Sequence, residues 1–166
     1  MTATWTAGPA SGSVDTLPNP FDIDAPESLG QRRYYQPKTP DRIAVTEPEI
    51  AADVLMPHFD GLDREACIAL YLDTKHRVQE VELVSLGSID KTFMSPREIF
   101  RGALLLNTPA LVIAHNHPSG DPEPSEDDVR VTRRIVRAGE IIGVDVLDHL
   151  VIGGQSWVSL ARRGHI

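Results

Sequence analysis

Residues 115–128 read His-Asn-His-Pro-Ser-Gly-Asp-Pro-Glu-Pro-Ser-Glu-Asp-Asp, and they follow a short apolar run, Ala110 to Ala114. This run is rich in branched side chains and has a proline on each side, which predicts a buried β-strand. Side chains two positions apart on a strand point to the same face, so His115 and His117 can reach one common atom. The prolines and glycine that follow predict a turn at the end of this strand.

The turn leads into a predicted helix that begins at Ser125. Ser125 and Asp128 have the spacing of a capping box. On a helical wheel Asp128 lies near an apolar stripe, so its carboxylate should point inward, towards the strand that carries the histidines. Two imidazoles and one carboxylate leave the fourth tetrahedral position of a zinc ion open, as in catalytic zinc sites. Taken singly, each residue is more often structural, but their joint pattern predicts a metal site. The predicted stripe consists of Val131, Ile135, Ala138 and Ile142.

The pattern resembles the metal-binding motif of the JAB1/MPN/Mov34 (JAMM) metalloenzymes, which is His-x-His, seven residues, then Ser-x-x-Asp. The form His-x-His-Pro-Ser-Gly is similar to that of the bacterial RadC group. The similarity extends to residues 87–89, 95–100 and 147–153, so it covers about residues 41–166. The resemblance implies an α/β fold of the MPN/JAB type, a mixed β-sheet flanked by helices in a layout like that of cytidine deaminases. It also implies one Zn²⁺ per chain, held by His115, His117 and Asp128.

A catalytic glutamate is expected in the predicted strand 78–86. Glu80 and Glu82 fall on one face of this strand, and the residues alone do not choose between them. In RadC-like sequences the glutamate stands five residues before the glycine of a Gly-Thr or Gly-Ser pair, here Gly87, so the resemblance selects Glu82 and leaves Glu80 as a solvated neighbour. Glu82 would act as general base and acid for a zinc-activated water. The Ser125 hydroxyl could donate to the developing oxyanion.

By resemblance the reaction is hydrolysis of a peptide or isopeptide bond in a protein or peptide substrate, whose identity the sequence does not carry. The alternative is a non-catalytic JAMM-like module that binds protein or DNA in a repair or mobile-element context. A zinc nucleoside deaminase would need Pro-Cys-x-x-Cys, which a chain with one cysteine cannot provide. The contiguous His-Asn-His letters do not indicate an HNH nuclease, whose residues are spread over a longer segment.

Composition narrows the classes of partner and compartment. The chain of 166 residues has a net charge of −8 and a pI near 5.1, which argues against strong non-specific attraction to nucleic acid or anionic membrane. Its single cysteine, Cys67, lies in an apolar run, so a buried thiol is expected. No apolar run is long enough to span a bilayer, and the N-terminus lacks the features of a signal peptide. A cytoplasmic location is therefore predicted.

Two further regions complete the predicted organisation. Residues 1–40 are rich in Pro, Ser, Gly and Thr and predict a disordered extension before a metalloenzyme domain at 41–166. RadC-type chains usually carry a helical region there, and none is recognised. The basic and aromatic patch 31–35 could dock on a partner or on the domain, although a solvated linker is favoured. Four arginines on the outer face of the helix that begins at Ser125 invite a phosphate-binding hypothesis, against which a solvated face is preferred. These arginines are Arg130, Arg133, Arg134 and Arg137.

The remaining predicted elements follow from capping and periodicity signals. Thr46 is expected to cap a helix with Pro48 at its first position, which Pro57 ends. A second capping box, Ser95 with Glu98, is expected to start another helix. The predicted helices cover about 48–56, 96–106 and 126–141, and the predicted strands cover 66–72, 78–86, 110–115, 144–152 and 157–160.

Overall fold

The computed structural model describes residues 43–87 and 94–166. Contacts between Cα atoms divide the chain into residues 1–39 and 40–166, and all described residues belong to the second unit. The predicted extension and its basic and aromatic patch lie outside the described residues. The elements are α1 (Pro48–Leu55), the 3₁₀ helix η2 (Met56–Phe59), β1 (Ala66–Leu72), β2 (Val78–Leu86), α2 (Pro96–Leu106), β3 (Ala110–Asn116), α3 (Glu126–Ile142), β4 (Asp145–Gly153) and β5 (Ser156–Ser159).

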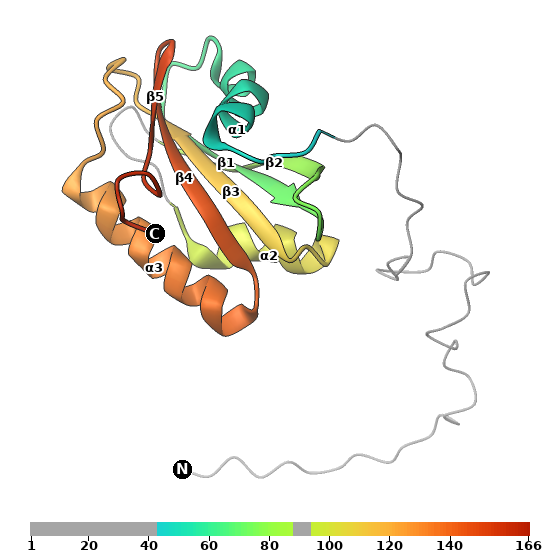
Figure 1. Cartoon of the computed structure of the whole chain (residues 1–166). Coiled ribbons are helices and arrows are strands. Elements are labelled where there is room, and N and C mark those ends of the chain that lie inside the picture. Colours follow the sequence, from blue (N-terminus) through green and yellow to red (C-terminus); the bar gives the residue numbers. More distant parts are fainter. Residues whose placement is uncertain (1–42, 88–93) are drawn as a thin grey trace, which may run out of the picture. The chain divides into compact units, whose positions relative to one another are not determined.

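The described strands form one mixed sheet in the order β2-β1-β3-β4-β5 (Figure 1). Neighbours pair antiparallel except β3 and β4, which run parallel because α3 connects them. Every residue of β1 and β3 is buried, which explains why both read as continuous apolar runs rather than as alternating patterns. The predicted α/β fold, a mixed sheet flanked by helices, is confirmed.

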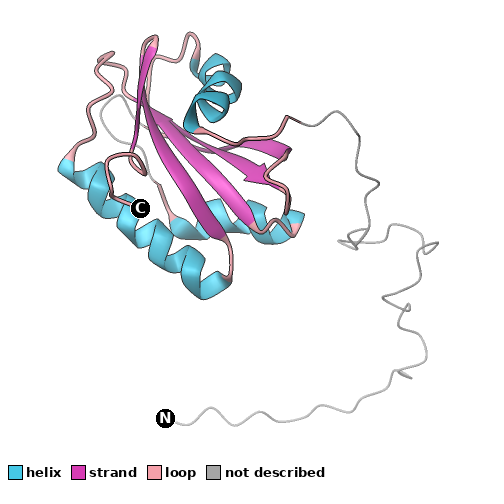
Figure 2. Cartoon of the chain, viewed as in Figure 1, coloured by secondary structure: helices cyan, strands magenta, loops and turns pink. Residues whose placement is uncertain are grey.

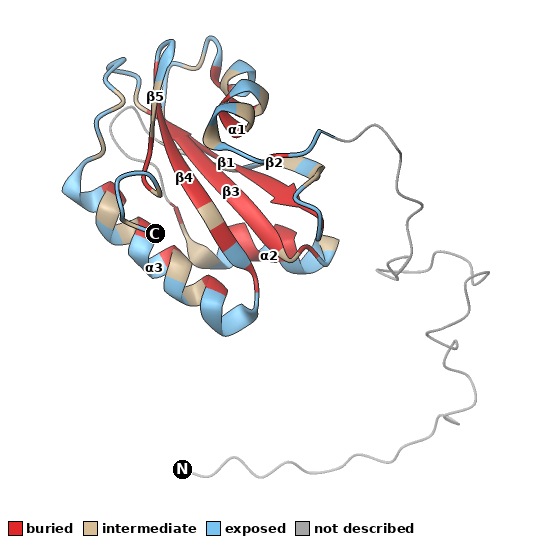
Figure 3. Ribbon diagram, viewed as in Figure 1, coloured by how far each residue is buried: buried red, intermediate tan, exposed pale blue. Residues whose placement is uncertain are grey.

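Helices cover both faces of the sheet (Figure 2). On one face α1 and η2 pack against side chains such as Leu70 and Leu150. On the other face α2 and α3 enclose a second apolar cluster that contains Tyr71, Ile113 and Ile135. Figure 3 shows the buried residues concentrated along the central strands, between these two layers. Since strand side chains alternate, His115 shares the α2 and α3 face with Ile113.

The two helices before His115 begin differently from the prediction. Pro48 starts α1 as expected, but the N-cap is Glu47 rather than Thr46. Helix α1 ends at Leu55, just before Pro57 as predicted, and Pro57 lies in the first turn of η2, where a proline needs no hydrogen-bond donor. The predicted capping box at Ser95 is wrong: Ser95 is the N-cap of α2, but its side chain makes no capping bond. The Glu98 carboxylate lies instead 3.7 Å from Arg101 Nε.

Helix α3 begins and ends as predicted, but its buried stripe is shifted. The Ser125 capping box is present, and Gly143 ends the helix in the left-handed conformation with φ of 81°. Ile142, expected in the core, is 39% exposed. The buried residues of α3 are instead four, three and four positions apart, and Ile135 is the large apolar side chain among them. The buried residues of α3 are Asp128, Thr132, Ile135 and Gly139.

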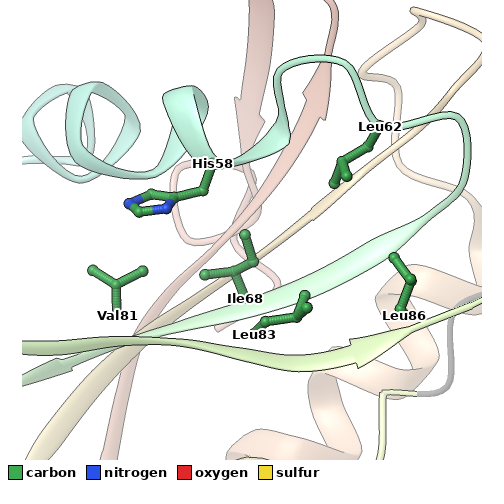
Figure 4. A pocket seen from close by; sticks show the side chains of 6 residues that line it. All are labelled: His58, Leu62, Ile68, Val81, Leu83 and Leu86. Carbon is green, nitrogen blue, oxygen red and sulfur yellow. The ribbon is translucent and has the colours of Figure 1, made fainter.

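The α1 face also carries an apolar groove of about 400 Å³ beside strand β2, at the edge of the sheet. In Figure 4 His58 and Leu62 lie across this groove from Val81 and Leu83. Because Val81 packs with the α1 cluster, the groove lies on the sheet face opposite His115. Within residues 43–87 and 94–166, no helix combines the length and apolarity needed to cross a membrane.

Candidate metal centre

The three predicted ligands meet where β3 ends and α3 begins. His115 is the next-to-last residue of β3 and is 1% exposed, and His117 follows the strand directly. The backbone N–H of His117 still donates to the carbonyl of Ile152 at the end of β4, over 2.8 Å. The strand direction is therefore kept past Asn116. This continuation lets both imidazoles point towards Asp128, a buried residue of the first turn of α3.

The separations between the three side chains suit a small metal ion. His115 Nε2 lies 3.1 Å from His117 Nε2 and 3.2 Å from Asp128 Oδ1, and His117 Nε2 lies 3.5 Å from Asp128 Oδ2. Two ligand atoms that each bind a tetrahedral zinc ion at about 2.0 Å are about 3.3 Å apart. One ligand atom from each residue lies within 4.8 Å of the others. These residues could thus hold a metal ion.

The proline-rich turn orients the ring of His117. His117 Nδ1 lies 2.8 Å from the carbonyl oxygen of Asp121, and a carbonyl only accepts, so Nδ1 carries a proton and Nε2 is the nitrogen that faces Asp128. The turn rests on Gly153, at the end of β4. A Cβ atom at residue 153 would lie 2.6 Å from the carbonyl oxygen of Gly120 and 2.5 Å from the nitrogen of Pro122. The lack of a side chain at Gly153 therefore lets the turn reach its position.

The two carboxylate oxygens of Asp128 have different partners. Oδ2 accepts hydrogen bonds from the backbone N–H and the hydroxyl of Ser125, at 2.7 and 2.6 Å. The Ser125 hydroxyl oxygen accepts in turn from the backbone N–H of Asp128. Oδ1 is left nearest to His115. The capping box thus fixes the Asp128 carboxylate at the start of α3. The hydroxyl proton of Ser125 is donated to this carboxylate, so the role of Ser125 as a donor to the oxyanion stays a prediction.

The electrostatics of the cluster favour a cation. Burial opposes the charge on Asp128, but hydrogen bonds from His115 and His117 outweigh it and hold the pKa of this carboxyl well below its usual range. The same contact with Asp128 raises the pKa of His117, although partial burial works against the increase. The carboxylate therefore stays ionised at neutral pH and supplies negative charge at the position a metal would occupy.

Glu82 lies on the same sheet face as the cluster but is bound to other groups. Its Oε2 lies 2.9 Å from the hydroxyl oxygen of Tyr71, and its Oε1 accepts from Arg101 Nη2 at 3.2 Å. A Cβ atom on Gly102 would overlap both the Glu82 carboxylate and the Tyr71 hydroxyl, so α2 approaches the sheet closely here. Glu80 is exposed.

The register of the sheet places Glu82 to one side of the predicted metal ligands. Glu82 pairs with Ala69 of β1, which pairs with Ile113 of β3, two residues before His115. In the described part of the chain, the group of potential ligand atoms contains His115, His117 and Asp128 and does not include Glu82. A catalytic role for Glu82 stays a prediction.

Sequence reasoning missed several residues that surround these side chains. Tyr71 and Gly102 contact Glu82 from β1 and α2, and Thr132 lies buried one turn after Asp128. No local pattern indicates the first two, because strand pairing and helix packing bring them together. The one signal for Thr132 is its position in the predicted helix. It stands four residues after Asp128 and three before Ile135, so a helical wheel places it on the same face as both.

The parallel β3–β4 unit, the helices on both faces and the His-His-Asp cluster at the strand end define an α/β domain of the JAB/MPN type with a potential metal site. A family model described as the RadC-like JAB domain matches residues 45–165. The chain therefore belongs to the RadC-like JAB domain family.

Curated relatives carry the family name UPF0758. A UPF0758 protein of Desulforamulus reducens is 40% identical over 144 residues, which are 87% of this chain and 63% of that protein. UPF0758 proteins of Bacillus cereus and Halalkalibacterium halodurans are 39% and 38% identical over 135 residues each, 81% of this chain and 60% and 58% of theirs. The chain thus spans about three fifths of the length of these relatives.

Proposed function

We propose that the chain is a zinc-dependent hydrolase of the JAMM type that cleaves a peptide or isopeptide bond with a metal-activated water. The observation that supports this most strongly is the spacing of 3.1 to 3.5 Å among His115, His117 and Asp128, since it fits the ligand separations of a tetrahedral zinc site. Three protein ligands leave one position for water or substrate. The substrate is proposed to be a protein or peptide, and the compartment the cytoplasm.

In this proposal each side chain has a separate task. A zinc ion, when bound, supplies Lewis-acid chemistry that activates water and polarises a carbonyl group. The capping box with Ser125 keeps Asp128 ionised and oriented, while the Asp121 carbonyl keeps the His117 ring turned towards it. Glu82 would take a proton from the attacking water and return it to the leaving amine. For this, its carboxylate has to exchange the hydrogen bond from Arg101 for one to the reacting water.

The test is a metal determination followed by peptidase assays on the purified full chain. We expect about one zinc per chain and turnover on a panel of peptides and isopeptide-linked lysine peptides. Glu82→Gln should keep the zinc and lose turnover by about 100-fold or more, since general acid–base catalysis contributes about that much. Glu80→Gln, an exposed glutamate on the same strand, is the matched control and should behave as wild type. Failure of the wild type to bind zinc would overturn the proposal.

The second candidate is a JAMM-like module that binds protein or DNA without turnover. It is favoured by the contacts of Glu82 and Ser125, whose functional groups are bound to Tyr71, Arg101 and Asp128. Zinc bound at full occupancy with no turnover across the substrate panel would support this module. For DNA, affinity should fall steeply with salt and with loss of the exposed arginines of α3. The net charge of −8, and an ion pair between Arg130 and Asp127, argue against strong DNA binding.

A further inference from the structure

Behind His115, a line of buried polar side chains leads from the metal cluster back to the start of α3. His115 Nδ1 lies 2.8 Å from His149 Nε2, and His149 Nδ1 lies 2.6 Å from the hydroxyl oxygen of Thr132. That hydroxyl lies 2.6 Å from the backbone carbonyl oxygen of Asp128. His149 comes from β4 and is fully buried, as is Thr132. The line therefore connects two metal ligands through two residues that are not ligands.

The direction of the hydrogen bonds is fixed at the Asp128 end. The carbonyl oxygen of Asp128 can only accept, and two oxygens at 2.6 Å need a proton between them, so the Thr132 hydroxyl must donate to this carbonyl. A hydroxyl has one proton. Thr132 therefore has only its lone pairs to offer His149, and the nitrogen facing it, Nδ1, must be the one that carries the proton.

The order of protons continues from His149 to the metal cluster. His149 is fully buried between His115 and Thr132, where a charged ring would be costly without a counter-charge, so the ring is neutral; with its proton on Nδ1, its Nε2 accepts. His115 Nδ1 must then donate the proton in the 2.8 Å contact. With the Nδ1 proton held in this bond, His115 would bind a metal ion through the lone pair of Nε2, the nitrogen that faces His117 and Asp128.

We propose that His149 and Thr132 are positioning residues that hold His115 in the tautomer whose Nε2 is free for a metal ion. The backbone carbonyl of Asp128 sets the order of protons, so the start of α3 supplies one metal ligand and selects the tautomer of another. The proposal rests on the metal site of the proposed function, but it concerns an order of protons that also exists in the metal-free protein. If Thr132 acted only by filling space, its branched shape would be sufficient and its hydroxyl would not be needed.

Zinc affinity separates these two roles. Thr132→Val keeps the branched shape and removes the hydroxyl, whereas Thr132→Ser keeps the hydroxyl and removes a methyl group. We expect the zinc dissociation constant, measured by competition with a chromophoric chelator, to rise about 10-fold to 100-fold in Thr132→Val, the range found for residues that orient metal ligands. Thr132→Ser should stay within about threefold of wild type. Equal zinc affinity of Thr132→Val and wild type would overturn the proposal, as would a greater loss in Thr132→Ser.

The tautomer can be read without any metal. In the metal-free, ¹⁵N-labelled chain, long-range ¹H–¹⁵N correlation of the imidazoles should show His115 protonated at Nδ1, the nitrogen that faces His149. Thr132→Val should shift this population towards rings without a proton on Nδ1, because His149 no longer meets a fixed acceptor. A wild-type His115 without a proton on Nδ1 would contradict the proposal even if the chain binds zinc. Lack of zinc binding together with the Nδ1–H form would instead overturn the proposed function and leave the tautomer assignment supported.

Discussion

At the scale of single residues, Cys67 shows how burial sets reactivity. The thiol lies on β1, fully buried, and burial raises its pKa to about 12. At pH 8 only about one thiol in 10⁴ would be ionised, and the thiolate is the reactive form. We expect a thiol-reactive disulfide reagent to leave the native chain unlabelled over minutes and to label one thiol per chain in denaturant. Fast stoichiometric labelling of the native chain would contradict this assignment.

Gly153 belongs to the same scale, because one missing side chain admits the turn that orients His117. In Gly153→Ala the new methyl group would meet the backbone of Gly120 and Pro122, and the turn would have to move. The Asp121 carbonyl would then leave His117 Nδ1. We expect zinc affinity to fall about tenfold or more, the usual effect of losing a group that orients a ligand.

Isothermal titration of zinc into folded Gly153→Ala checks this prediction. Ser156→Ala is the matched control, since Ser156 pairs with Gly153 across β4 and β5 and is exposed. Its zinc affinity should equal that of wild type. An unchanged affinity in Gly153→Ala would show that the turn adapts without losing its contact with His117.

At the scale of elements, the β1–β2 hairpin depends on a buried carboxylate. Asp73 accepts from the backbone N–H groups of Lys75 and Arg77 and from the Arg77 guanidinium. Burial opposes the charge, but these hydrogen bonds outweigh it and lower the pKa of Asp73 to about 2. Since the folded pKa lies below the unfolded value of about 3.9, this stability is fully present above about pH 5 and is lost as pH falls towards 2.

The corresponding variant is Asp73→Asn. Lowering a pKa from about 3.9 to about 2 is worth about 2.5 kcal/mol, so the free energy of unfolding at pH 7 should fall by about that amount. The difference between variant and wild type should shrink as the pH drops from about 4 to about 2. Urea unfolding at several pH values measures both effects. Asp53→Asn, on the exposed side of α1, is the control, and a loss for Asp73→Asn that does not depend on pH would contradict the argument.

Sequence and structure agree best where elements are defined locally. The strand before His115, the Ser125 capping box and the glycine at the end of α3 are local signals, and the structure contains all three. The Ser95 capping box did not form: the Ser95 side chain makes no capping bond, and the Glu98 carboxylate lies beside Arg101 instead. A local pattern predicts which hydrogen bonds a side chain is able to make. Which of these bonds forms depends on the neighbours of that side chain in the folded chain.

At the scale of the whole molecule, the candidate site depends on contacts that no local pattern contains. His115 meets His149 because β3 and β4 pair in parallel, and Thr132 meets His149 because α3 packs on β4. The spacing of His115 and His117 could be predicted from strand geometry, but the line of proton donors behind them could not. The position of Glu82, beside Tyr71 and Gly102, likewise follows from the packing of α2 on the sheet.

Because the ligands come from the end of β3 and the start of α3, metal binding should stabilise the folded domain. An ion that binds only the folded state adds about 2.7 kcal/mol at a free concentration 100 times its dissociation constant, which would raise the melting temperature by roughly 10 °C. Excess chelator should reverse the gain. Asp128→Asn should abolish the response, while Asp127→Asn, an exposed neighbour in the same turn, should keep it. Differential scanning calorimetry with and without zinc measures this, and equal responses of the two variants would mean that zinc binds elsewhere on the chain.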